Sequence, residues 1–276
     1  MKFEFHNAEN GVVLANTHRG YCEIYPENTM PAFEGALRAN THCIEIDIQL
    51  TRDNQLVVVH DHVVDRVSTG TGFVDRLTYE ELLAFDFGIK FGQEFKGTKI
   101  PLFVDVLSWA IKNGVGLIVE AKQRIRQDAF IDCFVNVIRA VPHAVNFIQL
   151  LSFDHVLINK VKKIIPELAL QVVTLERYNN QLECVLGSNA SCVCFEYEFA
   201  HIDDLRAYKQ HGLGTRMYLH AHSNNKTPTE NYYDKFGVEA EEEILAWIRE
   251  GLIDMISHDD ALYMISLINK ANMKAY

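Results

Sequence analysis

Long apolar runs and an excess of basic residues are both missing from this chain of 276 residues. No stretch approaches the roughly 18 uncharged apolar residues that a membrane-spanning helix needs, and the start, "MKFEFHNAEN", lacks the apolar core of a secretory signal. The 26 basic residues are outnumbered by 37 acidic ones, which argues against nucleic acid and against a polybasic membrane anchor. We therefore expect a cytoplasmic protein with no nucleic-acid partner and no stable membrane anchor.

Paired cysteines are missing as well. None of the six cysteines belongs to a C-x-x-C motif, and most of them fall inside apolar patterns. This arrangement indicates buried, reduced thiols and disfavours a disulfide framework or a zinc site. The six are Cys22, Cys43, Cys133, Cys184, Cys192 and Cys194.

Short β-branched runs alternate with amphipathic segments along the chain, among them 29–40 and 128–141. Asn28 or Thr29 is expected to cap the first of these helices. Eight strands that alternate with helices over roughly 250 residues are typical of an α/β fold of the (β/α)8 TIM-barrel type. No linker or low-complexity tract interrupts the pattern, so we expect one domain over 1–276. The predicted strands span residues 11–17, 43–50, 115–121, 146–152, 168–175, 191–197, 214–220 and 253–257.

The segment 51–61, "TRDNQLVVVHD", breaks this alternation, because it leaves no room for a crossover helix after the second strand. It is expected to return antiparallel through a turn at Asp53–Asn54. A tight turn pairs positions whose numbers sum to 107 and places His60 opposite Asp47. Residues 63–100 are then predicted to form a small insertion after this hairpin; a long ordered loop is the alternative.

Two strand ends carry paired charges. In "CIEIDIQL" (43–50) Glu45 and Asp47 share one face while isoleucines take the other, and "VGLIVEAK" ends with Glu120 and Lys122 on one face. Neighbouring carboxylates need a counter-ion. Three oxygen donors without a cysteine favour Mg²⁺ or Ca²⁺ over zinc. A purely structural network with Arg19 or Lys122 is the alternative.

The carboxyl ends of barrel strands gather on one face, where active sites lie in this fold. His18 and Arg19 end the first predicted strand there, and His60 returns to the same rim. Two histidines, two cations and three carboxylates suffice for metal-assisted cleavage of a phosphodiester. Each histidine taken alone is more often a hydrogen-bonded structural residue.

Several blocks, taken in order and spacing, resemble the signature of the glycerophosphodiester phosphodiesterase family. The resemblance is dense over residues 13–122 and thin beyond them. The blocks are "HRG" (18–20), "PENT" (26–29), "IEIDIQLTRD" (44–53), "VVVHD" (57–61), "LTYEELLAFDFGIKFGQEFKGTKIP" (77–101) with "TKIPLFVDVL" (98–107), "IVEAK" (118–122) and "LSFD" (151–154).

The resemblance implies hydrolysis of a small glycerophosphodiester to sn-glycerol 3-phosphate and an alcohol, with a divalent metal ion as cofactor. It implies that one histidine acts as base and the other as acid; we favour His18 as base and His60 as acid. The residues that it implies are His18 and His60 for catalysis, Glu45, Asp47 and Glu120 for the metal, and Arg19, Lys122 and Tyr218 for the substrate.

The carboxyl-terminal half departs from the family pattern. Tyr218 keeps an aromatic where the family has Trp-Thr-Val-Asn, Ser257–His258 replaces a final Thr-Asp, and a long loop, 221–237, is expected near the catalytic face. His220 and His222 are expected to be rim residues without a role. These departures leave open a lysophospholipase D or sphingomyelinase D-like activity, a non-catalytic phosphodiester-binding barrel, and the alcohol that is released. The sequence names neither the physiological metal nor the oligomeric state.

Overall fold

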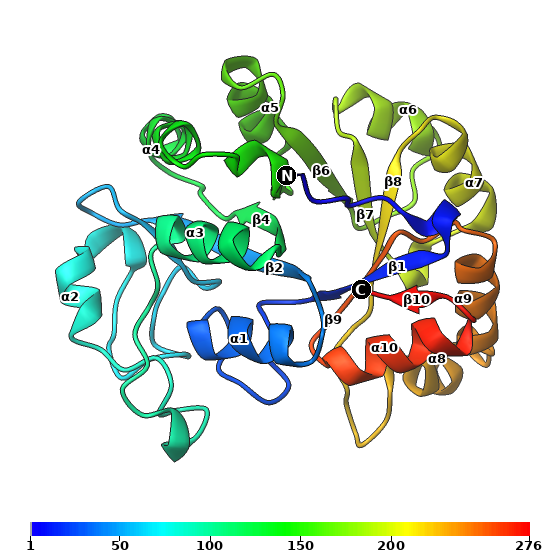
Figure 1. Ribbon diagram of the computed structural model, residues 1–276, viewed down its shortest axis with the longest axis horizontal. Coiled ribbons are helices and arrows are strands. Elements are labelled where there is room, and N and C mark those ends of the chain that lie inside the picture. The colour runs from blue at the N-terminus through cyan, green and yellow to red at the C-terminus, as the bar shows by residue number, and fades with distance from the viewer. Residues whose placement is uncertain (1) are drawn as a thin grey trace.

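A computed structural model describes residues 2–276, and its sheet closes into a barrel of eight parallel strands (Figure 1). Each strand pairs with the next barrel strand along the chain, and β9 pairs with β1 to close the ring. All eight predicted strands are confirmed. They are β1 (Val12–Thr17), β2 (Cys43–Leu50), β4 (Gly116–Ala121), β5 (Ile148–Ser152), β6 (Ala169–Thr174), β7 (Cys192–Glu196), β8 (Gly214–Tyr218) and β9 (Met255–His258).

Helices surround the barrel, and their apolar faces cover the outward side chains of the strands (Figure 1). The helices that connect consecutive barrel strands are α1 (Met30–Arg38), α3 (Phe103–Asn113), α4 (Gln127–Ala140), α5 (His155–Ile164), α6 (Gln181–Gly187), α7 (Ile202–Gln210) and α9 (Ala240–Arg249), and α10 (Ala261–Lys270) follows the last barrel strand. Two more, α2 (Tyr79–Leu83) and α8 (Pro228–Phe236), lie within connections. Short 3-10 turns are η1 (Ala8–Asn10), η2 (Val74–Arg76), η3 (Gln93–Phe95), η4 (Ala144–Asn146) and η5 (Tyr197–Phe199).

The predicted hairpin is present, but its predicted register is wrong by one residue. β3 (Leu56–Val58) runs antiparallel to β2, and its pairs sum to 106, for example Gln49 with Val57. The loop 52–54 holds three residues rather than two, because Asn54 takes a left-handed conformation with φ of 61°. Val59, and not His60, therefore faces Asp47 across the hairpin, where its N–H donates to the Asp47 carbonyl.

The insertion (residues 63–100) packs with β3 around a second apolar core beside the barrel, and Figure 1 shows the insertion with α2 as a lobe at the left. Thr78 caps α2 in a reciprocal capping box with Glu81. The side chain of each residue accepts a hydrogen bond from the backbone N–H of the other, so both N–H groups at the start of this short helix have a partner. The side chains of the insertion that share this core with β3 are Val64, Val74, Leu82, Phe87 and Ile100.

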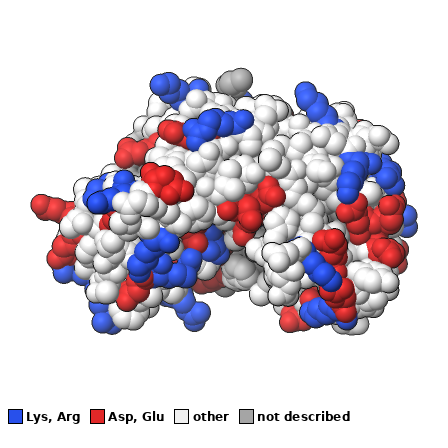
Figure 2. Space-filling view, turned by 90° about the horizontal axis from the view of Figure 1, so that it is seen from below, with Lys and Arg blue, Asp and Glu red and all other residues white. Residues whose placement is uncertain are grey.

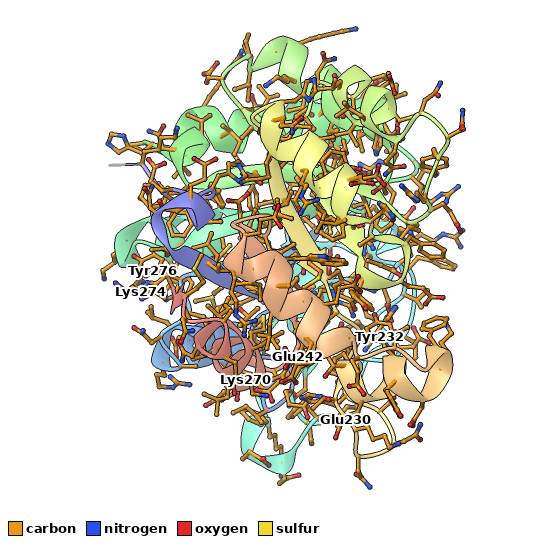
Figure 3. All side chains as sticks on the ribbon, turned by 90° about the vertical axis from the view of Figure 1, so that its right-hand side faces the viewer. Glu230, Tyr232, Glu242, Lys270, Lys274 and Tyr276 are labelled. Atoms are coloured by element: carbon orange, nitrogen blue, oxygen red, sulfur yellow. The ribbon has the colours of Figure 1, made fainter. Side chains whose placement is uncertain are left out.

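The two ends of the barrel differ. At the amino end, Phe3 and Phe5 close the interior, and β10 (Lys274–Ala275) pairs with β1. Figure 3 shows Lys274 and Tyr276 at this end of the barrel, whereas Tyr232 of α8 lies toward the other. The open carboxyl end is therefore left for polar side chains.

The surface of the protein carries charges of both signs, which are interspersed on the face in Figure 2. In residues 2–276, none of the helices has both the length and the apolar content that crossing a bilayer would require. The six cysteines are all free thiols. Cys184 is exposed rather than buried, because it lies on the outer face of α6.

Candidate active site

The three predicted metal ligands come together inside the carboxyl end of the barrel. Asp47 of β2 pairs directly with Glu120 of β4, so their side chains point to the same interior face, and Glu45 lies two residues earlier on that face. One oxygen from each carboxylate lies within 4.8 Å of the others. Glu45 and Asp47 are each 1% exposed, so the cluster is nearly closed to solvent.

The carboxylates of this cluster repel one another when no metal ion lies between them. Burial and the neighbouring Asp47 raise the pKa of Glu45 to about 8, and the same two causes raise the pKa of Glu120. Asp47 Oδ1 is buried and accepts no hydrogen bond from any of the described residues. The Lys122 ammonium already lies 2.8 Å from Glu120 and 3.8 Å from Asp47. Crowded oxygen donors with an unused lone pair fit a hard divalent cation such as Mg²⁺ or Ca²⁺.

His18 is held by an aspartate that our sequence analysis did not single out. Its Nδ1 lies 2.7 Å from Asp259 Oδ1, and its Nε2 lies 4.0 Å from Glu45 Oε2. Burial would raise the pKa of Asp259, but its hydrogen bond to His18 lowers the pKa to about 2. The ionised Asp259 accepts the proton of Nδ1, which leaves Nε2 of a neutral imidazole directed toward the carboxylate cluster. Burial lowers the pKa of His18, which favours this neutral form.

His60 has a parallel arrangement on the opposite side of the cluster. Its Nδ1 lies 2.7 Å from Asp61 Oδ1, and its Nε2 lies 3.1 Å from the Lys122 ammonium. Because β3 has already ended at Val58, His60 reaches the site from a bend in the chain and not by strand alternation. The position of His60 in the site therefore does not depend on the register of the hairpin.

Arg19 takes a left-handed conformation, with φ of 56°, at the end of β1. Its N–H donates to Glu45 over 3.1 Å, and its guanidinium lies 3.0 Å from Glu27 and 3.5 Å from Asp47. Burial alone would lower the pKa of Arg19, but these carboxylates raise it. Gly20 follows with φ of 83°, and a Cβ there would come within 2.7 Å of Ala32. This close approach explains the glycine after Arg19.

Asn28 is a second residue whose role the sequence analysis missed. It does not cap α1; its amide donates to Asp47 Oδ2 over 2.8 Å and accepts from the Asp47 N–H over 3.2 Å. Thr29 is the N-cap residue by position, but its hydroxyl donates to the Pro26 carbonyl instead. The only local signal for this role is that Asn tolerates the positive φ of 55° found here.

A cavity of about 180 Å³ opens beside these groups. Tyr218 lines it and packs its ring edge-on against His18, with the centroids 5.2 Å apart. One side of the cavity is polar and carries the histidines and carboxylates. The other is largely apolar and comes from β5, β6 and β7. The residues of the apolar side are Leu151, Phe153, Val173, Leu175, Cys194 and Phe195.

Glu196 and Arg216 also line this cavity, whereas His220 and His222 are not among the described residues of its lining. His220 is 54% exposed and lies 3.4 Å from Glu196, and His222 bonds Asp260 beneath Tyr263. Loop 221–237 contains α8, which begins at a capping box formed by Thr227 and Glu230. None of its side chains is among the described residues that line the cavity.

With this geometry in view, comparison with known proteins identifies the relatives of the chain. The sequence model for the Glycerophosphoryl diester phosphodiesterase family matches residues 18–260. The chain belongs to this family. A glycerophosphodiester phosphodiesterase from Caldanaerobacter subterraneus subsp. tengcongensis is 38% identical over 158 residues, which is 56% of this chain and 64% of that relative. The family expected from the motifs is thus confirmed, and the alignment spans just under two thirds of this relative's length.

Solved structures support the fold of this family member. A phosphodiesterase from Oleispira antarctica, determined in complex with the product sn-glycerol-3-phosphate, superposes with a TM-score of 0.77 at 19% identity and covers 95% of this chain and 99% of its own. A glycerophosphodiester phosphodiesterase from Agrobacterium tumefaciens gives a TM-score of 0.73 at 21% identity, with coverage of 92% and 99%. At these identities the likeness concerns the fold, and it confirms the TIM barrel.

Proposed function

We propose that this protein hydrolyses glycerophosphodiesters to sn-glycerol 3-phosphate and an alcohol. The observation that carries the proposal is the pairing of two histidines, each bonded through Nδ1 to its own aspartate, around a cluster of three carboxylates, of which Glu45 and Asp47 are buried. General acid–base cleavage of a phosphodiester needs one group to take a proton and another to give one. The membership of the chain in the phosphodiesterase family supports the same reaction.

In this proposal His18 is the base and His60 is the acid. His18 presents an unprotonated Nε2, and burial lowers its pKa, so it takes the proton of the nucleophile, which is either water or the 2-hydroxyl of the glycerol. In the second case a cyclic phosphate forms as the alcohol leaves, and water then opens it to sn-glycerol 3-phosphate. His60 gives its Nε2 proton to the departing alkoxide after the Lys122 ammonium, which lies 3.1 Å from this nitrogen, has moved to the phosphoryl group, and Asp61 holds the ring through Nδ1. Arg19 and Lys122 flank the carboxylates and hold the phosphoryl oxygens.

Glu45, Asp47 and Glu120 are the residues that would hold a divalent metal ion. Such an ion supplies charge neutralisation at the phosphoryl group and lowers the pKa of a bound hydroxyl. Asn28 fixes the rotamer of Asp47 by bonding both its carboxylate and its backbone N–H. Mg²⁺ and Ca²⁺ suit the all-oxygen donor set, and the set does not choose between them.

A second candidate function has one observation in its favour. The apolar side of the cavity continues to Phe153 and Leu175, which are 53% and 42% exposed. An acyl chain on the glycerol would find apolar contact there, as a lysophospholipase D or sphingomyelinase D-like substrate requires. Comparing lysophosphatidylcholine with glycerophosphocholine as substrate distinguishes the two functions.

The decisive experiment measures glycerol 3-phosphate release from glycerophosphocholine with Mg²⁺, with Ca²⁺ and with EDTA. We expect release that depends on the metal and falls by about 10²- to 10⁴-fold in His18→Asn, the range typical of a lost acid–base group. His220→Asn is the matched control, because this histidine is exposed and lies outside the cavity lining. No release from either substrate, in protein that binds the metal, would refute catalysis and favour a binding role.

A further inference from the structure

The side chain of Arg66, which belongs to the insertion, lies between the partner of His60 and the partner of Arg19. The Nε of Arg66 donates to Asp61 Oδ2 over 2.6 Å. Its two terminal nitrogens donate to the carboxylate of Glu27, at 2.6 Å and 2.8 Å. A single guanidinium thus bonds two carboxylates that come from different connections, one after β1 and one after β3.

Each of these carboxylates also holds a residue of the site. Asp61 uses its other oxygen, Oδ1, to bond Nδ1 of His60 at 2.7 Å. Glu27 bonds the guanidinium of Arg19 at 3.0 Å as well as that of Arg66. Arg66 is therefore linked to His60 through Asp61, and to Arg19 through Glu27.

We propose that Arg66 is a positioning residue, which sets His60 and Arg19 relative to each other through Asp61 and Glu27. This inference rests on the proposed function, in which His60 gives a proton and Arg19 holds the phosphoryl group. The guanidinium suits the task because its donors form a rigid planar fork that fixes both distance and angle. An acid and a phosphate clamp must keep a common geometry, since a shift of about 1 Å costs about 100-fold in rate.

The insertion provides a fixed anchor for Arg66. Val64, two residues earlier, is fully buried in the core of the insertion, and its N–H donates to the Gly72 carbonyl. The N–H of Ser68 donates to the Val64 carbonyl, which closes a turn around Arg66. Because the backbone on both sides of Arg66 is held by the core of the insertion, the guanidinium of Arg66 keeps a fixed position relative to the site.

The exposure of Arg66 separates this role from a purely stabilising one. Its side chain is 50% exposed, so water screens its ion pairs with Asp61 and Glu27. Removing the guanidinium should therefore change the unfolding temperature little. An effect on catalysis without a comparable effect on stability is what the positioning role predicts.

The test compares Arg66→Gln with Glu27→Gln and Asp61→Asn in glycerophosphocholine turnover. We expect Asp61→Asn to lower mainly kcat, Glu27→Gln to raise mainly KM, and Arg66→Gln to do both. The kcat/KM of Arg66→Gln should be lower by about 10- to 100-fold, which is usual when a residue that orients a site residue is removed. Arg66→Lys should recover only part of this loss, because an ammonium does not bond both carboxylates in the same geometry. Arg66→Gln added to Asp61→Asn should not lower kcat further, because the two variants break one chain of bonds.

Arg52→Gln is the matched control. Arg52 is 56% exposed and also bonds a carboxylate through two oxygens, that of Glu81 on α2, but it contacts no site residue. Unchanged kcat and KM in Arg66→Gln, or equal losses in Arg52→Gln and Arg66→Gln, would overturn the inference.

A calorimetric titration keeps the inference testable without turnover. With Mg²⁺ present, sn-glycerol 3-phosphate should bind Arg66→Gln about 10-fold or more weakly than it binds wild type, since Glu27, which bonds Arg19, loses its fixed position. Equal affinity in the two proteins would overturn the inference. A wild-type protein that binds this product but releases none from either diester would refute the proposed function alone, and the comparison of affinities would still decide on Arg66.

Discussion

His258 should make the stability of this protein fall as the solution is acidified. The side chain is fully buried at the end of β9. Its Nε2 lies 3.0 Å from the carbonyl oxygen of His220, so it carries the proton and donates. Its Nδ1 accepts from the N–H of Asp260 over 2.9 Å. Both ring nitrogens are therefore satisfied only in the neutral imidazole, and protonating Nδ1 breaks one of these bonds.

The size of the effect follows from the shift in pKa. Burial lowers the pKa of His258 to about 4 from its ordinary value of 6.5, even though Asp259 and Asp260 act to raise it. Between these two pH values the unfolded chain binds a proton that the folded chain does not, so the free energy of unfolding decreases as the pH falls. The full loss is about 3 kcal/mol, at about 1.4 kcal/mol for each pH unit between the two values.

Urea unfolding of the wild type and His258→Gln, at a series of pH values from above 6.5 to about 4, measures this loss. The glutamine cannot titrate, yet its amide has one donor and one acceptor for the same two partners. His18 also has a lowered pKa, but it titrates in both proteins and cancels in the comparison. We expect the stability of the wild type to fall by about 3 kcal/mol more than that of the variant. Parallel curves for the two proteins would show that the reasoning about His258 is wrong.

Two further changes test the residues that shape the site. Asn28→Ala should weaken Mg²⁺ binding by about 10- to 100-fold in a calorimetric titration, because the Asp47 carboxylate loses its amide donor; unchanged affinity would contradict the role given to Asn28. Gly20→Ala should lower the free energy of unfolding by about 1–3 kcal/mol, because the new Cβ would meet Ala32 at 2.7 Å and φ is 83°. Chemical denaturation measures this change, and a variant as stable as the wild type would contradict it.

The alternation of side chains along β2 made the carboxylate cluster predictable. Glu45 and Asp47 differ by two positions in an otherwise apolar strand, and that parity alone puts both in the barrel. The register of the hairpin was not predictable in the same way. It depended on the left-handed conformation of Asn54, which lengthens the loop by one residue, and Asp53–Asn54 suits the shorter turn equally well in sequence.

The partners of the predicted residues were the harder part. Asp259 lies 241 residues after His18, and only the closure of the barrel between β9 and β1 brings the two together. No local pattern marks Asp259 as the partner of a histidine, because two adjacent aspartates before a helix read first as capping residues. Asp260 is indeed the cap of α10. The neighbouring aspartate was free for another role, which only tertiary structure defines.

Asn28, Glu27 and Arg66 show the same division from another side. Local rules assign an Asn before a helix to capping, an exposed Glu–Arg pair to the solvated surface, and an insertion to a loop without a task. In the folded protein Asn28 holds Asp47, while Glu27 and Arg66 connect Arg19 to Asp61 and so to His60. The position of a reactive group at a strand end can be predicted from the alternation of side chains, and its chemistry from its residue type. The residues that orient these groups lie close to them only in the folded protein. The sequence therefore identifies the reactive groups, and the structure is needed to identify their partners.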